Sequence, residues 1–195
     1  DDVESRGLGD VYKRQVMMRV ITGSARGRRL ETLPGEDVTR PTSESVKEAL
    51  FSMIQFEIEG KKVLDLFAGS GQLGIEALSR GAGECVFVEM NKNARAVVLR
   101  NIQKCGFEHV SRVIPADAQA YAASCPGFDI VFLDPPYHKG MVTGILPVLE
   151  SRLNPGAVVA CETASAEELP QTVGSLSVIR SRRYGKTKLT LYRKE

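Results

Sequence analysis

The chain contains 195 residues, of which 43% are hydrophobic and 26% are charged, and this composition is typical of a globular domain. No run of residues approaches the roughly eighteen consecutive apolar positions that indicate a membrane span. The four cysteines lie far apart, and no two of them form a Cys-x-x-Cys pair. Their spacing argues against a zinc site or a disulfide framework and favours buried thiols in a reducing cytoplasm.

The net charge of +2 conceals an uneven distribution of charge along the chain. Residues 51–179 carry ten Lys and Arg against fourteen Asp and Glu, a net charge of −4, whereas residues 180–195 carry seven basic residues and one acidic residue, a net charge of +6. A second basic cluster near the start contains Arg26, Arg28 and Arg29. Basic ends around an acidic middle fit two interpretations equally: binding of a polyanion by the ends, or a solvated basic face.

The first fifteen residues differ in character from the rest of the chain. They show little hydrophobic periodicity and no apolar stretch of the length found in secretory signals. Residues 6–15 resemble a translated sequencing-adapter artefact, so we expect residues 1–15 to be a non-native leader. We divide the remainder into a small basic β-hairpin extension at residues 16–37 and a main domain at residues 38–195.

The extension is predicted from a change in pattern after the leader. Residues Arg19 to Thr22 read as a short strand, and residues 23–29 form a glycine-rich basic turn. The chain then returns through Leu30 and Leu33. We therefore expect a hairpin with a basic tip.

Short apolar runs alternate with amphipathic segments through the main domain. Apolar residues spaced by three and four positions predict helices, and runs of Val, Ile, Leu and Phe predict strands. Strands are expected at 63–67, 85–88, 110–114, 128–133, 157–161, 176–183 and 188–192. Helices are expected from Thr42 or Ser43 after Pro41, at 72–79, around 94–102, at 118–123 and around 142–149. This alternation predicts one α/β domain with a parallel sheet covered on both faces and an antiparallel C-terminal hairpin at one edge.

A glycine-rich turn follows the first strand of this sheet, at the edge where α/β sheets bind ligands. Gly69, Gly71 and Gly74 match the G-x-G-x-x-G fingerprint, and Glu89 lies twenty residues beyond Gly69. Glycines let the backbone approach a ligand, and the helix N-terminus offers free N–H groups. Several nucleotide cofactors use this turn, and a tight turn without any ligand would show the same pattern.

Acidic residues at the strand ends favour S-adenosylmethionine over NAD as the ligand. Asp65 lies where it can pair with a positively charged amino group, and Glu89 can accept hydrogen bonds from two ribose hydroxyls. Asp117 can receive the adenine amine or can simply cap the following helix. The candidate cofactor-binding residues are Asp65, Phe67, Gly69, Ser70, Gly71, Glu89, Asp117 and Asp134.

The most specific motif is Asp134-Pro135-Pro136-Tyr137, directly after the fourth strand. Two prolines restrict the backbone, so the Asp134 carboxylate and the Pro135 carbonyl are aimed in set directions. Two acceptors held in this way can bind both hydrogens of an exocyclic NH2 group. Tyr137 offers a face on which a flipped base can stack, with Pro136 beside it. We therefore predict Asp134, Pro135 and Tyr137 as catalytic residues and Pro136 and Tyr137 as substrate-binding residues.

These motifs carry a resemblance to a known family. Asp134 to Tyr137 resembles motif IV of the amino-methyltransferases, and Asp65 to Gly71 resembles their motif I. With Arg40-Pro41-Thr42-Ser43 and Arg183-Tyr184-Gly185, they resemble the RsmD family of bacterial 16S rRNA guanine-N2 methyltransferases. The likeness runs from about Met18 to Tyr192.

The resemblance implies a Rossmann-like class I S-adenosylmethionine-dependent methyltransferase with a seven-stranded, mainly parallel sheet, an antiparallel C-terminal hairpin and a small N-terminal β-hairpin. It implies methylation of a guanine N2 amine in 16S rRNA, within the small ribosomal subunit or its assembly intermediate. Ala116 replaces a glycine of many relatives, which weakens the assignment of Asp117 to adenine. We expect a cytoplasmic monomer without a metal or a membrane partner.

Basic side chains are the candidate phosphate contacts, since such contacts supply affinity without reading sequence. They are Arg26, Arg28, Arg29, Arg182, Arg183 and Lys186. Two alternatives remain open at this stage. One is an adenine-N6 methyltransferase on DNA or RNA, although 195 residues leave little room for a separate DNA-recognition domain, which counts against a sequence-specific DNA enzyme. The other is an NAD-dependent oxidoreductase, which leaves the motif at Asp134 unexplained.

Overall fold

A computed structural model describes residues 18–34, 43–136 and 140–195 of the chain. The expected leader at residues 1–15 therefore lies outside the described residues. The same holds for the predicted segment at Arg40, Pro41 and Thr42 and for Tyr137.

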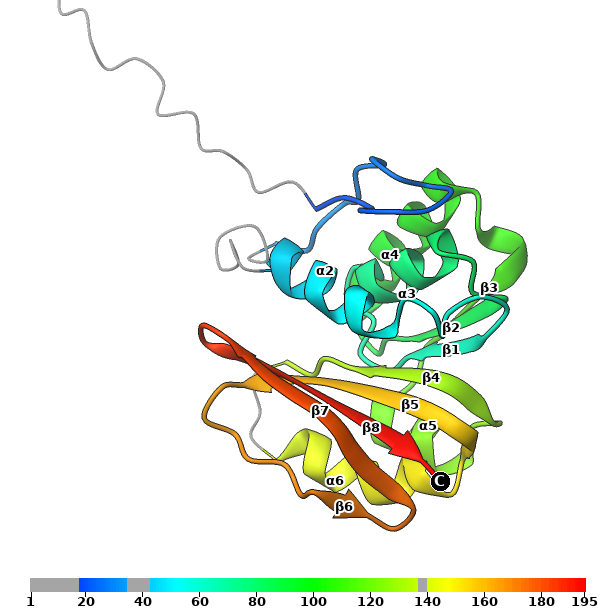
Figure 1. Cartoon of the computed structure of the whole chain (residues 1–195). Coiled ribbons are helices and arrows are strands. Elements are labelled where there is room, and N and C mark those ends of the chain that lie inside the picture. The colour runs from blue at the N-terminus through cyan, green and yellow to red at the C-terminus, as the bar shows by residue number, and fades with distance from the viewer. Residues whose placement is uncertain (1–17, 35–42, 137–139) are drawn as a thin grey trace, which may run out of the picture.

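The described residues form one mixed sheet of eight strands in the order β3-β2-β1-β4-β5-β8-β7-β6 (Figure 1). The strands β1 to β5 are parallel, and β6, β7 and β8 add antiparallel pairs at one edge. Their bounds are β1 Lys62–Asp65, β2 Glu84–Val88, β3 Ser111–Ile114, β4 Phe128–Leu133, β5 Leu153–Ala164, β6 Thr172–Val173, β7 Leu176–Tyr184 and β8 Thr187–Lys194. The expected fold class is confirmed.

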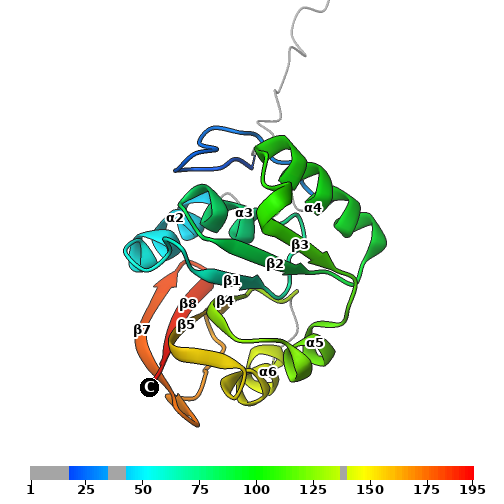
Figure 2. The ribbon, with the colours of Figure 1, turned by 90° about the vertical axis from the view of Figure 1, so that its right-hand side faces the viewer.

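Helices cover both faces of the sheet, as parallel strands require. Figure 2 shows α2, α3 and α4 on one face and α5 and α6 on the other. The helices are α2 Ser43–Ile54, α3 Gln72–Ser79, α4 Lys92–Cys105, α5 Ala118–Ser124 and α6 Met141–Glu150, with a 3-10 turn η1 at Glu108–Val110. The left-handed Gly106, with φ of 74°, ends α4 as its position after the apolar stripe predicted.

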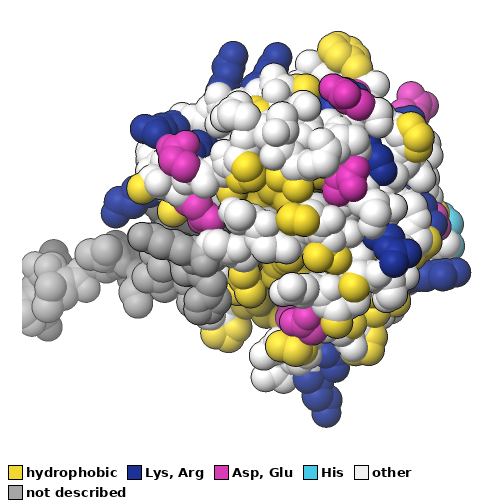
Figure 3. All heavy atoms as spheres, turned by 90° about the horizontal axis from the view of Figure 1, so that it is seen from below, with side chains coloured by type: hydrophobic (Ala, Val, Ile, Leu, Met, Phe, Trp, Pro, Cys, Tyr) yellow, Lys and Arg dark blue, Asp and Glu magenta, His cyan; other side chains and the backbone are white. Residues whose placement is uncertain are grey.

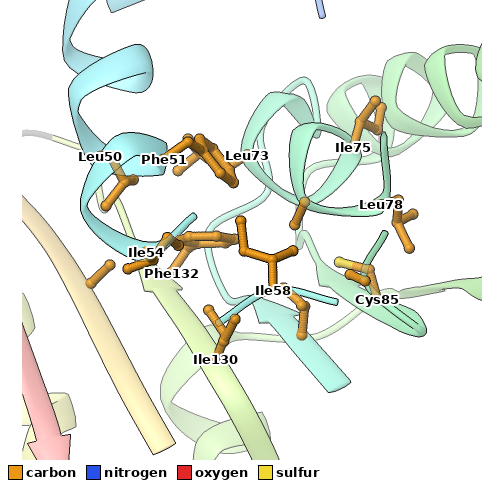
Figure 4. Close-up of a cluster of buried hydrophobic side chains, with 14 of the residues drawn as sticks. Leu50, Phe51, Ile54, Ile58, Leu73, Ile75, Leu78, Cys85, Ile130 and Phe132 are labelled. Atoms are coloured by element: carbon orange, nitrogen blue, oxygen red, sulfur yellow. The ribbon is translucent and has the colours of Figure 1, made fainter. Parts of the chain in front are cut away.

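The core consists of two apolar clusters, one on each face of the sheet. Successive strand side chains point to opposite faces, so Val63 joins the cluster under α2 to α4 whereas its neighbour Leu64 joins the one under α5 and α6. Figure 4 shows part of the first cluster, where Phe51 of α2 packs on Phe132 of β4 with ring centroids 5.5 Å apart. All four cysteines are buried and free, as their spacing predicted.

Three boundaries differ from expectation. The sheet has eight strands instead of seven, because the two residues of β6 pair with the start of β7. The strand β5 extends over Leu153–Ala164 because β8 pairs with it up to Ala164, beyond the apolar run at 157–161. The strand β3 begins only at Ser111, because the three residues before it form η1.

The N-terminal segment at residues 18–34 forms a weaker hairpin than predicted. Its two arms are joined by a single isolated bridge, between Arg19 and Arg29, instead of by a ladder of paired strands. The N–H groups of Ile21 and Thr22 donate to the two carboxylate oxygens of Glu76 in α3, at 2.9 and 3.0 Å. The expected strand from Arg19 to Thr22 is therefore wrong, because a buried side chain satisfies these backbone groups.

Glu76 is the centre of a buried polar network that fastens this segment to the helices. Its side chain has no exposed surface, and it also pairs with Arg80 at 2.9 Å and with Lys47 of α2 at 3.7 Å. Lys47 in turn donates to the Arg19 carbonyl at 2.7 Å. Burial lowers the pKa of the Lys47 ammonium, which the Glu76 carboxylate partly offsets. The segment, α2 and α3 are thus joined through one carboxylate.

The surface seen from below in Figure 3 separates apolar from basic side chains. Hydrophobic side chains gather in a hollow in the middle of this face, and Lys and Arg side chains lie around its periphery. Within the described ranges, none of the helices is long and apolar enough to cross a membrane.

We predict that Glu76→Gln lowers the free energy of unfolding by about 3–5 kcal/mol, because it leaves the buried Lys47 ammonium without its counter-charge. The measurement is urea-induced unfolding followed by circular dichroism. The control is Glu84→Gln, which removes an exposed pair with Lys62 and should cost less than about 1 kcal/mol. Equal effects of the two substitutions would contradict the role given to Glu76.

Candidate functional site

A cavity of about 670 Å³ opens at the carboxyl ends of β1 to β4. The strand order reverses between β1 and β4, which is where α/β sheets form ligand crevices. Its volume is in the range of pockets for small ligands and cofactors. The predicted residues that line it are Asp65, Phe67, Gly69, Ser70, Glu89, Asp117, Asp134, Pro135 and Pro136.

Asp65 ends β1 and presents a buried carboxylate to this cavity. One of its oxygens accepts a hydrogen bond from the Gly74 N–H at 3.0 Å. Burial raises the pKa of Asp65 to about 7, the Gly74 N–H opposes this shift, and the Asp134 and Glu89 carboxylates add to it. A cationic group entering the cavity would favour the charged form of Asp65 and lower its pKa again.

The glycines of the turn are required for two different structural reasons. Gly69 and Gly71 adopt φ of 55° and 82°, in the left-handed region that favours glycine. A Cβ on Gly74 would lie 2.3 Å from Cε1 of Phe87, so glycine allows α3 to pack closely against β2. Gly71 is the one predicted cofactor-binding residue that does not line the cavity; it begins α3 as the N-cap.

Glu89 follows β2 and is held by two backbone groups. The Gly69 N–H donates to Oε2 and the Asn91 N–H donates to Oε1, both at 2.9 Å. These bonds orient the carboxylate toward the cavity and tie it to the glycine-rich turn. A carboxylate has about four lone-pair positions, so both oxygens keep capacity for hydroxyl donors.

Asp117 lies at the N-terminus of α5, where the sequence left two roles open. Its Oδ1 accepts the Ala120 N–H at 2.9 Å, so the capping role is confirmed. Asp117 also lines the cavity beside Ala116 and Ala118. The cap occupies one oxygen, and the contact of the other with adenine stays a prediction.

The motif after β4 reaches the same cavity. Asp134, Pro135 and Pro136 all line it, and the Asp134 carboxylate is near enough to Asp65 to raise the pKa of that group. We call the motif at residues 134–137 the diproline corner. Its described residues, Asp134 to Pro136, line the same cavity as the glycine-rich turn, although the two lie 60 or more residues apart in the sequence. Tyr137 belongs to the residues outside the described ranges.

One set of predicted basic residues lies on the same side of the sheet as the cavity, at the carboxyl ends of the parallel strands. The pairing of Ala164 with Thr187 places the turn between β7 and β8 at the carboxyl end of β5. The Ser165 N–H donates to the Lys186 carbonyl at 2.8 Å, which ties this turn to the segment after β5. Arg182, Arg183 and Lys186 are exposed there, and the Arg183 guanidinium is 3.3 Å from Glu168.

The other predicted basic set lies on the opposite side of the molecule from the cavity, at the C-terminal ends of α3 and α4. The Ser24 N–H donates to the carbonyl of Ser79, the last residue of α3, at 2.8 Å. The guanidinium of Arg28 donates to the Lys104 carbonyl near the end of α4 at 2.8 Å. Because α4 begins beside the cavity and rises about 1.5 Å per residue, this end lies about 20 Å away. The structure does not bring Arg26, Arg28 and Arg29 to the cavity.

Several residues of the cavity wall were not predicted. Met90 directly follows Glu89, so reading one residue further at the strand end would have found it. Others come from the N-terminal segment, which shows no sequence signal for this location. The unpredicted lining residues include Met18, Leu33, Pro34, Met90, Asn91, Asn93 and Met141.

Comparisons with known proteins agree with this geometry. A family model described as Conserved hypothetical protein 95 matches residues 18–193. The chain belongs to this family. YlbH of Bacillus subtilis is 40% identical over 183 residues, covering 91% of this chain and 99% of that protein. Ribosomal RNA small subunit methyltransferase D of Haemophilus influenzae is 37% identical over 158 residues, covering 78% and 81%. The solved structure of yhhF from Escherichia coli is 30% identical with a TM-score of 0.81, covering 92% of this chain and 98% of that chain.

The resemblance to the RsmD family is confirmed, and the chain is a methyltransferase that uses S-adenosyl-L-methionine. The alternative of an NAD-dependent oxidoreductase is therefore wrong. The residues present fit this cofactor: Asp65 offers a buried anion for its ammonium group, and Glu89 offers acceptors for its ribose hydroxyls. No group of three His, Cys, Asp or Glu side chains suited to a metal ion occurs in the part of the chain that the structure describes.

We predict that Asp65→Asn flattens the pH dependence of stability in the cofactor-free protein. The folded pKa of about 7 lies above the ordinary value of 3.8, so the native state holds an extra proton between these values. Stability is therefore lost as pH rises from about 4 to 7, at up to about 1.4 kcal/mol per pH unit from this group. The measurement is the free energy of unfolding at intervals across this range.

The matched control for this prediction is Asp129→Asn, near the start of β4 and away from the cavity. The Lys62 N–H and the Asn154 amide hold the pKa of Asp129 below its ordinary value, although burial opposes them. This group stays ionised above pH 4 and should leave the wild-type slope unchanged. An Asp65→Asn slope equal to that of the wild type would show that Asp65 is not protonated in the folded protein.

Proposed function

We propose that this methyltransferase transfers a methyl group from S-adenosyl-L-methionine to the exocyclic N2 amine of a guanine in 16S rRNA. The substrate is the small ribosomal subunit or an assembly intermediate, and the enzyme acts on it in the cytoplasm as a monomer. The observation that carries the proposal is the convergence of two motifs: Asp134, Pro135 and Pro136 line the same cavity as Asp65 and Glu89.

The nature of the substrate is supported by relatives. Proteins named Ribosomal RNA small subunit methyltransferase D from Haemophilus influenzae and Escherichia coli are 37% and 32% identical to this chain. The charge distribution supports the same substrate, because residues 180–195 carry a net charge of +6 and include an exposed turn at the carboxyl end of β5, on the side of the sheet where the cavity opens. Cationic side chains at this edge can bind the phosphates that flank a target nucleotide.

The chemistry assigns different tasks to the residues of the corner. When bound, the cofactor supplies a methyl group on a sulfonium, which needs no metal or covalent enzyme intermediate. Asp134 and the Pro135 carbonyl accept the two hydrogens of the target amine and orient its nitrogen lone pair for in-line attack. Such groups accelerate the reaction by orientation and by hydrogen bonds that strengthen in the transition state. Asp134, or water, receives the proton that the product loses.

Tyr137 completes the proposed corner as the face on which the flipped guanine stacks. On the cofactor side, Asp65 holds the ammonium group, Glu89 the ribose and Asp117 the adenine amine. Phe67, Gly69 and Ser70, which line the same cavity, contact the cofactor beside these residues, and Gly71 is the N-cap of α3.

The substrate is tested by labelled methyl transfer onto small subunits isolated from a strain that lacks this methylation, followed by nucleoside analysis. The proposal expects label in N2-methylguanosine from 16S rRNA. Label in N6-methyladenosine would support the adenine alternative instead. In a parallel reaction with naked DNA, label on the DNA together with unlabelled subunits would exclude the ribosomal substrate.

We predict that Asp134→Ala lowers turnover by about a hundredfold or more, because it removes an acceptor whose hydrogen bond strengthens in the transition state. The dissociation constant of S-adenosylhomocysteine, measured by calorimetry, should change little. The control is Asp129→Asn near the start of β4, the strand that precedes Asp134; the Asp129 carboxyl contacts Lys62 and Asn154 and does not line the cavity. Single-turnover methylation by Asp134→Ala at the wild-type rate would remove Asp134 from the mechanism.

We predict that replacing Arg182, Arg183 and Lys186 by Ala weakens subunit binding. The slope of log K against log salt should fall by about one for each phosphate that the variant no longer binds. Replacing Arg26, Arg28 and Arg29 tests whether the RNA also reaches the far edge of the sheet. We expect a reduced slope there too. An unchanged affinity and slope would show that the basic tip is a solvated face.

A further inference from the structure

Asn101 is a buried carboxamide in the middle of the polar contacts between α4 and the rest of the chain. It has no exposed surface. Its Oδ1 accepts the Glu31 N–H at 2.7 Å, and its Nδ2 donates to the Glu31 carbonyl and to the Ser70 carbonyl, both at 2.9 Å. The side chain therefore pairs with Glu31 as a neighbouring strand would, while its second N–H holds the glycine-rich turn.

The two hydrogen-bond partners of Asn101 belong to segments that form the cavity wall. Ser70 lines the cavity, and its hydroxyl lies 3.4 Å from the sulfur of Met18, another wall residue. Two and three residues beyond Glu31, Leu33 and Pro34 line the cavity from the N-terminal segment. One side chain thus joins two wall elements that are about 35 residues apart in the sequence.

We infer that Asn101 is a positioning residue for the cofactor, which sets the glycine-rich turn and the segment at residues 31–34 in their places around the cavity. Asn is the side chain whose length and donor set fit this site. Asp lacks both N–H donors and would place oxygen against two carbonyls, and Leu of similar size would leave all three backbone groups unpaired. This inference rests on the cofactor and is independent of the rRNA substrate.

Ser79 also holds the N-terminal segment and serves as the control, because it attaches the segment to α3 without lining the cavity. Ser79 is also buried, and its Oγ accepts the Ala25 N–H at 2.9 Å and donates to the Thr22 carbonyl at 2.6 Å. It lies at the opposite end of α3 from the glycine-rich turn and does not line the cavity. Loss of Ser79 loosens the same segment without touching the cavity wall.

The experiment compares Asn101→Asp with Ser79→Ala by calorimetric titration of S-adenosylhomocysteine and by urea unfolding. Both substitutions should lower stability. Asn101→Asp should raise the dissociation constant by roughly tenfold, because it breaks two hydrogen bonds of the cavity wall. Ser79→Ala should leave the constant within about twofold of the wild type. In the methyl-transfer assay, Asn101→Asp should raise the KM for S-adenosylmethionine more than it lowers kcat, whereas loss of folded protein would lower kcat alone.

Two outcomes would overturn the inference: a dissociation constant of Asn101→Asp within about twofold of the wild type, or equal increases in both variants. If Asn101→Asp does not fold, hydrogen exchange in the wild-type protein decides. Binding of S-adenosylhomocysteine should slow exchange of the Glu31 amide, which donates to Asn101, more than that of the Ala25 amide, which donates to Ser79. Equal protection of the two amides would contradict a special role for Asn101.

Discussion

The hydrogen bond from the Gly74 N–H to the Asp65 carboxylate is the contact on which the geometry of the site depends. The first N–H groups of a helix have no partner within the helix, and Asp65 satisfies one of them from the end of β1. The bond closes the turn between β1 and α3, and it places the Asp65 carboxyl group beside the positive end of the helix dipole, which favours its charged form. Burial nevertheless raises the pKa of Asp65 to about 7, so this carboxylate is poised to gain a cationic partner.

Two other buried polar side chains extend this arrangement to the N-terminal segment. Glu76 holds the backbone of Ile21 and Thr22, and Asn101 holds the backbone of Glu31. Both side chains bind the backbone as a neighbouring strand would, which is why the segment stays in place with a single bridge of its own. Its packing on α3 and α4 makes Leu33 part of the cavity wall. The N-terminal segment therefore forms part of the cavity wall as well as carrying basic residues.

The two groups of basic residues differ in their relation to the chemistry. The turn between β7 and β8 lies at the edge of the sheet where Asp134 lies, because β8 runs antiparallel to β5. The tip of the N-terminal segment lies at the other ends of α3 and α4, with Arg28 bound to the Lys104 carbonyl. A substrate that contacts both groups has to extend along the whole length of the helices. That extent fits a large folded RNA better than a free nucleotide.

The sequence by itself determined the strand and helix alternation, the class of fold and the strand-end residues Asp65, Glu89 and Asp134. These follow from local signals: the hydrophobic period, the glycines of the turn, and the rule that parallel strands present their carboxyl ends at one edge. Only the tertiary structure shows that Arg19 to Thr22 do not form the predicted strand, and that Glu76 and Asn101 bind the backbone of the N-terminal segment. A buried polar residue on a helix shows the same local pattern as an exposed one, and its partners lie about 55 to 70 residues away. Only folding brings such groups together, since their pairing depends on distance in space and leaves no period in the sequence.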